Sequence, residues 1–121
     1  MSGCAAVDPM AIRCDEYNGV CVVAVDGDLA GDAVAEARGV VDGALSRRDA
    51  RGIVFDLGDC HFVDSAALEL LCLVRRRCDD VGTRVGLARV GPACAKILEL
   101  TRLAGQFDCH ADVARALAAA R

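Results

Sequence analysis

The sequence lacks a long apolar run. No stretch approaches the roughly 18 to 20 apolar residues that cross a bilayer, and the N-terminus has no basic-then-apolar signal arrangement. We therefore expect a cytoplasmic protein with no direct membrane insertion. The chain also lacks a surplus of positive charge, because 14 basic residues stand against 18 acidic ones and the net charge is -4. Direct binding to nucleic acid is not expected.

Motifs for catalysis or metal binding are missing as well. The eight cysteines contain no Cys-x-x-Cys, and both histidines directly follow a cysteine, which is not the spacing of a standard zinc module. Residues 86–91 have the glycine spacing of a P-loop, but Pro92 and Ala93 stand where Lys and Ser/Thr are needed. Ser65 lacks the flanking glycines of a hydrolase nucleophile. We expect no enzyme activity, no cofactor and no metal.

The cysteines indicate packing rather than a disulfide framework. Such frameworks belong to secreted chains without a large core, whereas this chain is 55% hydrophobic and has no export signal. We expect mainly reduced cysteines, with Cys21 and Cys78 as small packing residues. Cys60 is the exception to test, because it precedes Ser65 and could be oxidised there if exposed, although its acidic neighbours should disfavour its thiolate.

Apolar periodicity predicts alternating strands and helices. The 121 residues fit a single domain (1–121), of α/β class (α+β by some schemes), with a hairpin at Asn18-Gly19 and parallel pairs in its sheet. The expected strands span 11–17, 20–25, 52–57, 84–90 and 106–108. The expected helices span 31–45, 65 to just before Gly82, 92 to about 104, and 111–120.

Ser65 stands at the expected start of the second long helix, directly after Asp64. A serine or aspartate at this position is often an N-cap, whose side chain accepts a hydrogen bond from a backbone N–H. Glu69 lies four residues after Ser65 rather than three, so no capping box decides the register. The residues alone leave Ser65 open to a structural or a functional role.

The surroundings of Ser65 resemble the signature of the STAS domain. Residues 53–68, IVFDLGDCHFVDSAAL, are similar to the family's hydrophobic strand, short loop and Asp-Ser-Ser/Thr-Gly-Leu helix start. Residues 84–92 and 97–107 resemble the next strand, turn and helix, and residues 25–29 resemble the family's Gly-Glu-Leu-Asp strand end. The resemblance spans about residues 10–118. It implies a mixed β-sheet of four to five strands with helices largely on one side.

The resemblance also implies a function, that of a bacterial anti-sigma factor antagonist. Such a protein binds an anti-sigma factor serine/threonine kinase of the histidine-kinase-like ATPase fold, and sigma factor is released for transcription. Phosphorylation of the serine after the motif aspartate, here Ser65, ends the binding, and a phosphoserine phosphatase restores it. We expect the partner to contact Asp59, Asp64, Ser65, Ala66, Leu68, Glu69 and Leu70.

Two positions depart from the family pattern, because Ala66 and Ala67 stand where Ser/Thr and Gly are common. Alanine favours a helix over glycine by about 0.8 to 1 kcal/mol, so we expect a stiffer helix start. The domain also recurs in transporters. The alternative is therefore a STAS regulatory subunit of a membrane transport complex, for lipid or anion transport, with Ser65 as a structural helix cap.

Overall fold

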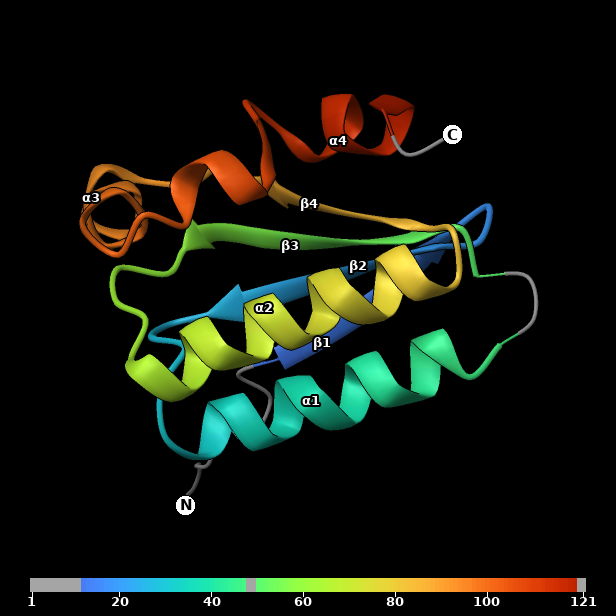
Figure 1. Cartoon of the computed structure of the whole chain (residues 1–121), viewed down its shortest axis with the longest axis horizontal. Coiled ribbons are helices and arrows are strands. Elements are labelled where there is room, and N and C mark those ends of the chain that lie inside the picture. The colour runs from blue at the N-terminus through green and yellow to red at the C-terminus, as the bar shows by residue number, and fades with distance from the viewer. Residues whose placement is uncertain (1–11, 48–49, 120–121) are drawn as a thin grey trace, which may run out of the picture.

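The computed structural model of the protein describes residues 12–47 and 50–119. The described residues form a five-stranded sheet in the order β1-β2-β3-β4-β5. Its strands are β1 (Ile12–Tyr17), β2 (Val20–Asp26), β3 (Gly52–Asp59), β4 (Arg84–Ala88) and β5 (Asp108–His110). The helices are α1 (Asp32–Leu45), α2 (Ser65–Asp80), α3 (Pro92–Leu100), the 3-10 helix η1 (Ala104–Gln106) and α4 (Val113–Ala119). Figure 1 shows their arrangement.

The sheet is mixed, as the sequence predicts. β1 and β2 are antiparallel, and the pairs from β2 to β5 are all parallel. Asn18 and Gly19 join the hairpin with φ values of 52° and 88°, the positive values that a tight two-residue hairpin turn favours. β2 is buried on both faces over Val20–Val23, because it lies inside the sheet.

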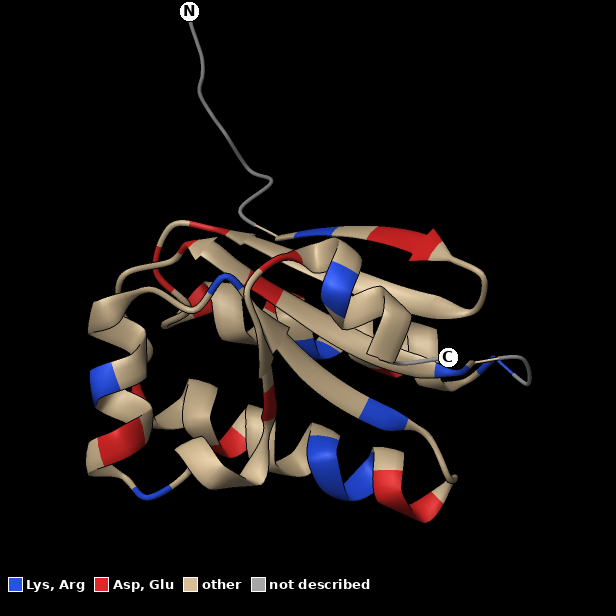
Figure 2. Cartoon of the chain, turned by 90° about the horizontal axis from the view of Figure 1, so that it is seen from above, with Lys and Arg blue, Asp and Glu red and all other residues tan. Residues whose placement is uncertain are grey.

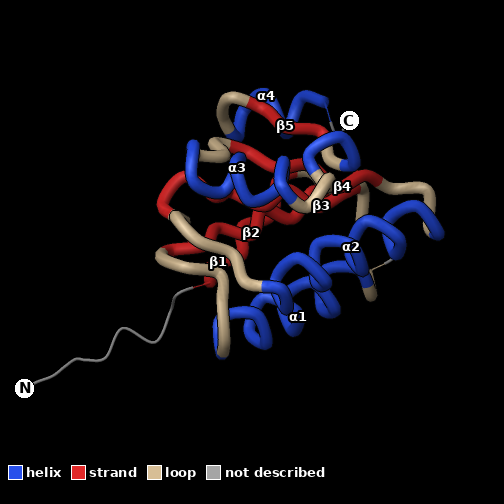
Figure 3. Tube along the Cα trace, turned by 60° about the vertical axis from the view of Figure 1, so that its left-hand side comes forward, coloured by secondary structure: helices blue, strands red, loops and turns tan. Residues whose placement is uncertain are grey.

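Helices cover the two faces of the sheet unequally. α1 and α2 lie side by side against one face, as Figures 1 and 3 show from two directions. The main core lies beneath them, and α3 adds Cys94 and Leu98 to it. α4 packs on the other face through Ala116. The apolar stripe predicted for α2 is confirmed, because its four members are fully buried: Ala67, Leu71, Val74 and Cys78.

Charged residues of both signs are interspersed over the elements (Figure 2). Arg77 of α2 forms an ion pair with Asp42 of α1, which links the two long helices. Arg75 pairs with Asp79 one turn along α2, at 3.2 Å. Both pairs are well exposed, so each contributes little to stability.

Several element boundaries differ from the prediction: β2, β3 and β5 end one or two residues later than expected, and α3 ends at Leu100 rather than near Ala104. Two of the other differences have a clear cause. β5 begins at Asp108 rather than Gln106, because Gln106 belongs to η1 and the buried Phe107 packs in the core before the chain joins the sheet. β4 ends at Ala88 rather than Val90, because Arg89 adopts a φ of 55° that ends the extended strand. The expected residues Ala11 and Ala120 lie outside the described residues.

Arg89 forms the best-defined ion pair of the sheet. Its Nε and Nη2 donate to the two oxygens of Asp56 at 2.8 and 2.9 Å. A Cβ atom added at Gly58 would lie 2.3 Å from the Arg89 Cζ, so a glycine there leaves room for the guanidinium. Burial alone would raise the pKa of Asp56, but Arg89, the Gly58 N–H and the charge of Arg13 outweigh it and lower that pKa.

We expect the Asp56–Arg89 pair to stabilise the protein at neutral pH and to lose this effect in acid. Because the pKa of Asp56 is lower in the folded state, its contribution is present above about pH 4 and disappears as the pH falls through the folded-state pKa. Asp56→Asn should lower the unfolding free energy by roughly 1 kcal/mol at pH 7, since Arg89 is partly screened by solvent. Urea titrations at pH 7 and at about pH 2.5, well below the unfolded-state pKa, measure this. Asp79→Asn is the control, and an equal effect of both variants would contradict the prediction.

Cys14 and Cys21 form a disulfide across the hairpin. The expectation of a reduced Cys21 is therefore wrong. Cys14 is opposite Val23 and Cys21 is opposite Glu16, so the two cysteines are diagonal neighbours on one face, with Cα atoms 6.4 Å apart. The other described cysteines are unbridged, in line with the prediction: Cys60, Cys72, Cys78, Cys94 and Cys109.

We expect this disulfide to contribute about 2 to 3 kcal/mol to stability. It closes a loop of about eight residues, for which the chain-entropy relation yields roughly 2.5 kcal/mol. Reductant should therefore lower the urea midpoint of the wild-type protein. A Cys14→Ser/Cys21→Ser variant should unfold at the same midpoint with and without reductant. If reductant shifts the variant as much as the wild type, another cysteine is responsible.

Candidate functional site

The Asp64 carboxylate joins the starts of the two long helices. Asp64 is the N-cap of α2, and its Oδ1 accepts a hydrogen bond from the Ala67 N–H at 2.8 Å. Its Oδ2 accepts from the N–H of Gly31, the residue before α1, at 3.2 Å. One side chain therefore positions both helix starts.

The loop before Ser65 is held by a neighbouring segment of backbone. Leu29 donates from its N–H to the Phe62 carbonyl at 2.9 Å, and its own carbonyl accepts from the Asp64 N–H at 3.3 Å. The Leu29 and Val63 side chains beneath these bonds are buried. Leu29 and Val63 also form a parallel β-bridge. These contacts connect the approach to α1 with the approach to α2.

Ser65 is the first residue of α2, and its side chain is exposed. Because Asp64 accepts the capping bond, the interpretation of Ser65 as a structural helix cap is wrong. Within residues 12–47 and 50–119 the Ser65 hydroxyl has no hydrogen-bond partner. A negative group on this hydroxyl would lie at the N-terminus of a 16-residue helix, where the helix dipole favours it.

Most of the predicted contact residues are accessible. Asp59, Ala66 and Glu69 are exposed, as is Ser65, whereas Asp64 and Leu68 are half-buried. Leu70 differs from the others, because its side chain is only 4% exposed and belongs to the main core. Helical periodicity explains this burial: Leu70 lies three residues after Ala67 and therefore on the inner face of α2.

A groove next to Ser65 contains residues that the sequence interpretation missed. Its volume is about 600 Å³ and it lies between α1, α2 and the segment after α3. It is lined by Val34, Arg38, Ala66, Leu68, Glu69, Leu70, Cys72, Leu73, Arg76 and Leu103. No sequence motif could group the α1 residues and Leu103 with α2, since they are far apart in the chain. Arg38 and Arg76 line this groove and add positive charge near the acidic residues Asp64 and Glu69.

Phe62 was also missed, although its side chain is 46% exposed in the loop three residues before Ser65. The sequence feature that could have indicated Phe62 is an aromatic residue in the short loop between β3 and α2. Aromatic side chains are enriched in protein–protein interfaces, and Phe62 lies close in the chain to Ser65. Phe62 therefore joins the candidate site.

Cys60 is buried at 1% exposure, so it is not the accessible thiol that oxidation near Ser65 would require. Its Sγ donates to the Phe62 carbonyl at 3.3 Å and lies 3.8 Å from the Sγ of Cys94. Burial and the neighbouring Cys60 raise the pKa of Cys94 to about 12. These two thiols act as packing residues in the core.

The described residues contain no cluster of three or more His, Cys, Asp or Glu side chains that could hold a metal ion. Among the helices of the described chain, none has the length and apolar character needed to cross a membrane.

A model of the STAS domain family matches residues 11–116. The chain belongs to the STAS domain family. The match includes the Asp64–Ser65 helix start and ends within α4. A comparison with curated protein sequences found no significant match.

Solved structures share this STAS fold at low sequence identity. An anti-sigma factor antagonist from Mycobacterium paratuberculosis has a TM-score of 0.79 at 23% identity, with 91% of this chain and 92% of that chain covered. The Bacillus cell fate determinant SpoIIAA in its phosphorylated form has a TM-score of 0.75 at 21% identity, covering 92% and 100%. A sulfate transporter family protein from Wolinella succinogenes has a TM-score of 0.68 at 17% identity, covering 84% of each chain. These likenesses confirm the predicted fold.

The division of roles between Asp64 and Ser65 is testable by stability. Asp64→Ala should lower the unfolding free energy by about 1 to 2 kcal/mol, because it removes the N-cap and the bond from Gly31. Ser65→Ala should change it by less than about 0.5 kcal/mol, since no bond of the fold is lost. Urea titration of the two variants measures both effects. A larger loss for Ser65→Ala than for Asp64→Ala would reverse the assignment.

Proposed function

We propose that this STAS domain is an anti-sigma factor antagonist whose binding to an anti-sigma factor kinase ends when Ser65 is phosphorylated. The observation that carries the proposal is the exposed Ser65 hydroxyl, which has no partner in the described chain because Asp64 holds the cap. A kinase can modify this hydroxyl without breaking a hydrogen bond of the fold. Unmodified, the protein binds the kinase and sigma factor is released.

The physical effect of phosphorylation falls on binding rather than on folding. A phosphoserine adds about -1.5 to -2 charge, and the dipole at the start of α2 stabilises it there. The new charge stands next to Asp64 and about one turn from Glu69. A partner surface packed on Ala66 and Leu68 would therefore meet a bulky acidic group, which disfavours association.

The groove beside Ser65 supplies the apolar part of the proposed contact. Leu68 and Leu103 offer half-buried apolar surface, and Arg38 and Arg76 flank it with positive charge. A partner segment that carries apolar side chains and a carboxylate would complement this surface. We assign that segment to the serine/threonine kinase, of histidine-kinase-like ATPase fold, and the reset to a phosphoserine phosphatase, both in the cytoplasm.

The alternative function was a regulatory subunit of a membrane transport complex, with Ser65 as a structural cap. Asp64 fills the capping role, so this alternative leaves the exposed Ser65 without a purpose. Genes beside this one discriminate between the two functions. A kinase or sigma factor gene supports the switch, whereas permease and ATPase genes support the transport subunit.

We expect Ser65 to be the residue that the anti-sigma factor kinase modifies. When the full chain is incubated with ATP and the kinase encoded beside this gene, the wild type should become phosphorylated. The Ser65→Ala variant should not. Ser46→Ala is the matched control, because Ser46 is also exposed but lies at the far end of α1, and this variant should be phosphorylated normally.

Binding should follow the charge at Ser65. By calorimetry, Ser65→Ala should bind the kinase with wild-type affinity, and Ser65→Glu should bind at least about tenfold more weakly, a loss of about 1.4 kcal/mol. Unfolding curves of the same variants show whether each is folded. Equal affinity of the wild type and a folded Ser65→Glu would overturn the proposal.

A further inference from the structure

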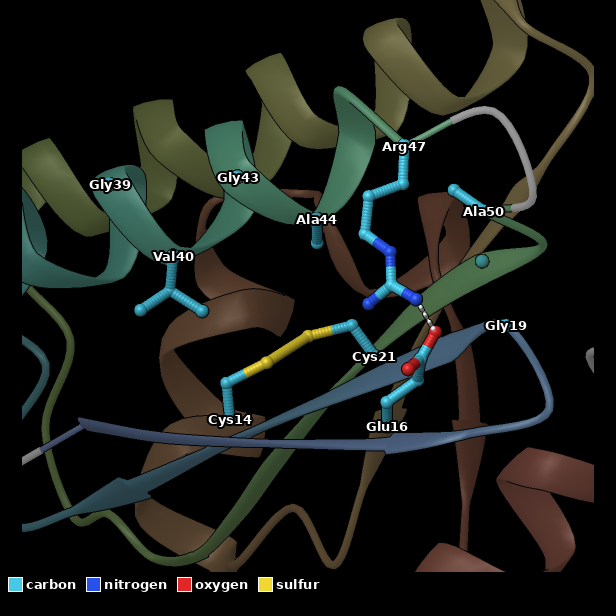
Figure 4. A pocket seen from close by; sticks show the side chains of 11 residues that line it. Cys14, Glu16, Gly19, Cys21, Gly39, Val40, Gly43, Ala44, Arg47 and Ala50 are labelled. Carbon is cyan, nitrogen blue, oxygen red and sulfur yellow. Dashed lines mark ion pairs between the residues drawn. A yellow bond between two sulfur atoms is a disulfide. The ribbon is translucent and has the colours of Figure 1, made fainter.

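A second hollow lies between α1 and the β1–β2 hairpin, near the C-terminal end of α1 (Figure 4). Its volume is about 290 Å³. Gly39 and Gly43 form its helix side, and a Cβ atom added at either would meet no other atom within 4 Å. The Cys14–Cys21 disulfide crosses its strand side, as Figure 4 shows. Ser65 lies at the other end of the helix layer, beside the start of α1.

One cysteine of this disulfide is exposed and the other is buried. Cys14 is exposed on β1, whereas Cys21 on β2 is 6% exposed. A dissolved thiol therefore reaches the Sγ of Cys14 more readily. The disulfide itself is the electrophile in such an exchange, and a thiolate is the nucleophile.

Positive charge marks the rim of the hollow. Arg47 reaches from the end of α1 to Glu16 on β1, with 2.5 Å between Nη2 and Oε2 (Figure 4). An adjoining depression shares Glu16 and Arg47 with the hollow and adds Arg51. In the described part of the chain, the Arg51 side chain has no ion-pair partner. A ligand with a negative group is therefore favoured at this rim.

We propose that the hollow is a thiol–disulfide exchange site, at which a small thiol carrying a carboxylate becomes disulfide-bonded to Cys14. The apolar lining from Val40 and Ala44 takes the carbon chain of this thiol, and Arg51 attracts its carboxylate. The inference does not depend on the proposed function at Ser65.

The exchange needs no oxidant. The ligand thiol loses its proton, and its thiolate attacks the Sγ of Cys14. The bond between Cys14 and Cys21 breaks as the bond from the ligand sulfur to Cys14 forms. The electron pair leaves on Cys21, which takes up one proton, so one disulfide is consumed and one is made. The Cys21 sulfur lies on the Arg47 side of the disulfide in Figure 4. The positive charge of Arg47 stabilises the leaving thiolate, and the negative charge of Glu16 reduces this stabilisation.

The experiment uses the oxidised full chain under anaerobic conditions, with 3-mercaptopropionate as the carboxylate thiol and 2-mercaptoethanol as the neutral one. Peptide mapping should locate the mercaptopropionate adduct on Cys14. At equal thiolate concentration, the exchange rate should be about two- to fivefold higher for mercaptopropionate than for mercaptoethanol. This is the rate ratio that one exposed charge pair produces. Arg51→Gln should remove this preference while leaving the mercaptoethanol rate unchanged.

Two controls keep the result interpretable. Cys14→Ser should form no adduct, and the exposed free Cys109 should form none in any variant, because it has no disulfide to exchange. Unfolding curves establish that each variant is folded. An adduct on Cys21, equal rates for the two thiols, a preference that survives Arg51→Gln, or a purified protein with both thiols of the pair reduced would each overturn the proposal.

Discussion

The candidate site depends on one carboxylate, that of Asp64. Its two oxygens accept hydrogen bonds from two segments, the first turn of α2 and the residue that precedes α1. Backbone bonds between Leu29, Phe62 and Asp64 hold the same two segments together. Because the N-terminal N–H groups of a helix need acceptors, an aspartate here satisfies a local need and also sets the spacing of two helices. The groove beside Ser65 lies on the helix layer organised in this way.

The cap on Asp64 also determines what Ser65 can do. A serine that caps a helix has its oxygen committed to a backbone N–H, and modification would disrupt that bond. With the cap one residue earlier, the Ser65 hydroxyl has no hydrogen-bond partner among the described residues. The helix cap and the proposed phosphorylation site are therefore two neighbouring residues, and a charge added at Ser65 would leave the cap in place. The same helix buries Leu70, so its inner and outer faces have separate roles.

Among the described residues, two pairs of neighbouring cysteines differ in their surroundings and therefore in their chemistry. Cys60 and Cys94 lie in contact within the core, where burial raises the pKa of Cys94 and keeps the pair away from solvent. Cys14 and Cys21 lie on the strand face next to the glycines of α1, and one of them is exposed. Thiol chemistry requires access and a thiolate, so only the second pair suits exchange.

The sequence by itself determined the class of fold, the hairpin turn at Asn18-Gly19 and the buried stripe of α2, because these follow from local conformational preference and from apolar period. The motif around Asp64 and Ser65 also identified the family before any coordinate. Only the tertiary structure decided which of the two residues caps α2, because that choice depends on a shift of one residue in the helix start. It also decided that Arg38 and Leu103 share a groove with Leu68, and that Cys14 reaches Cys21. These features depend on strand register and on contacts between segments that are distant in sequence. The spacing of residues along the chain is therefore not enough to predict them.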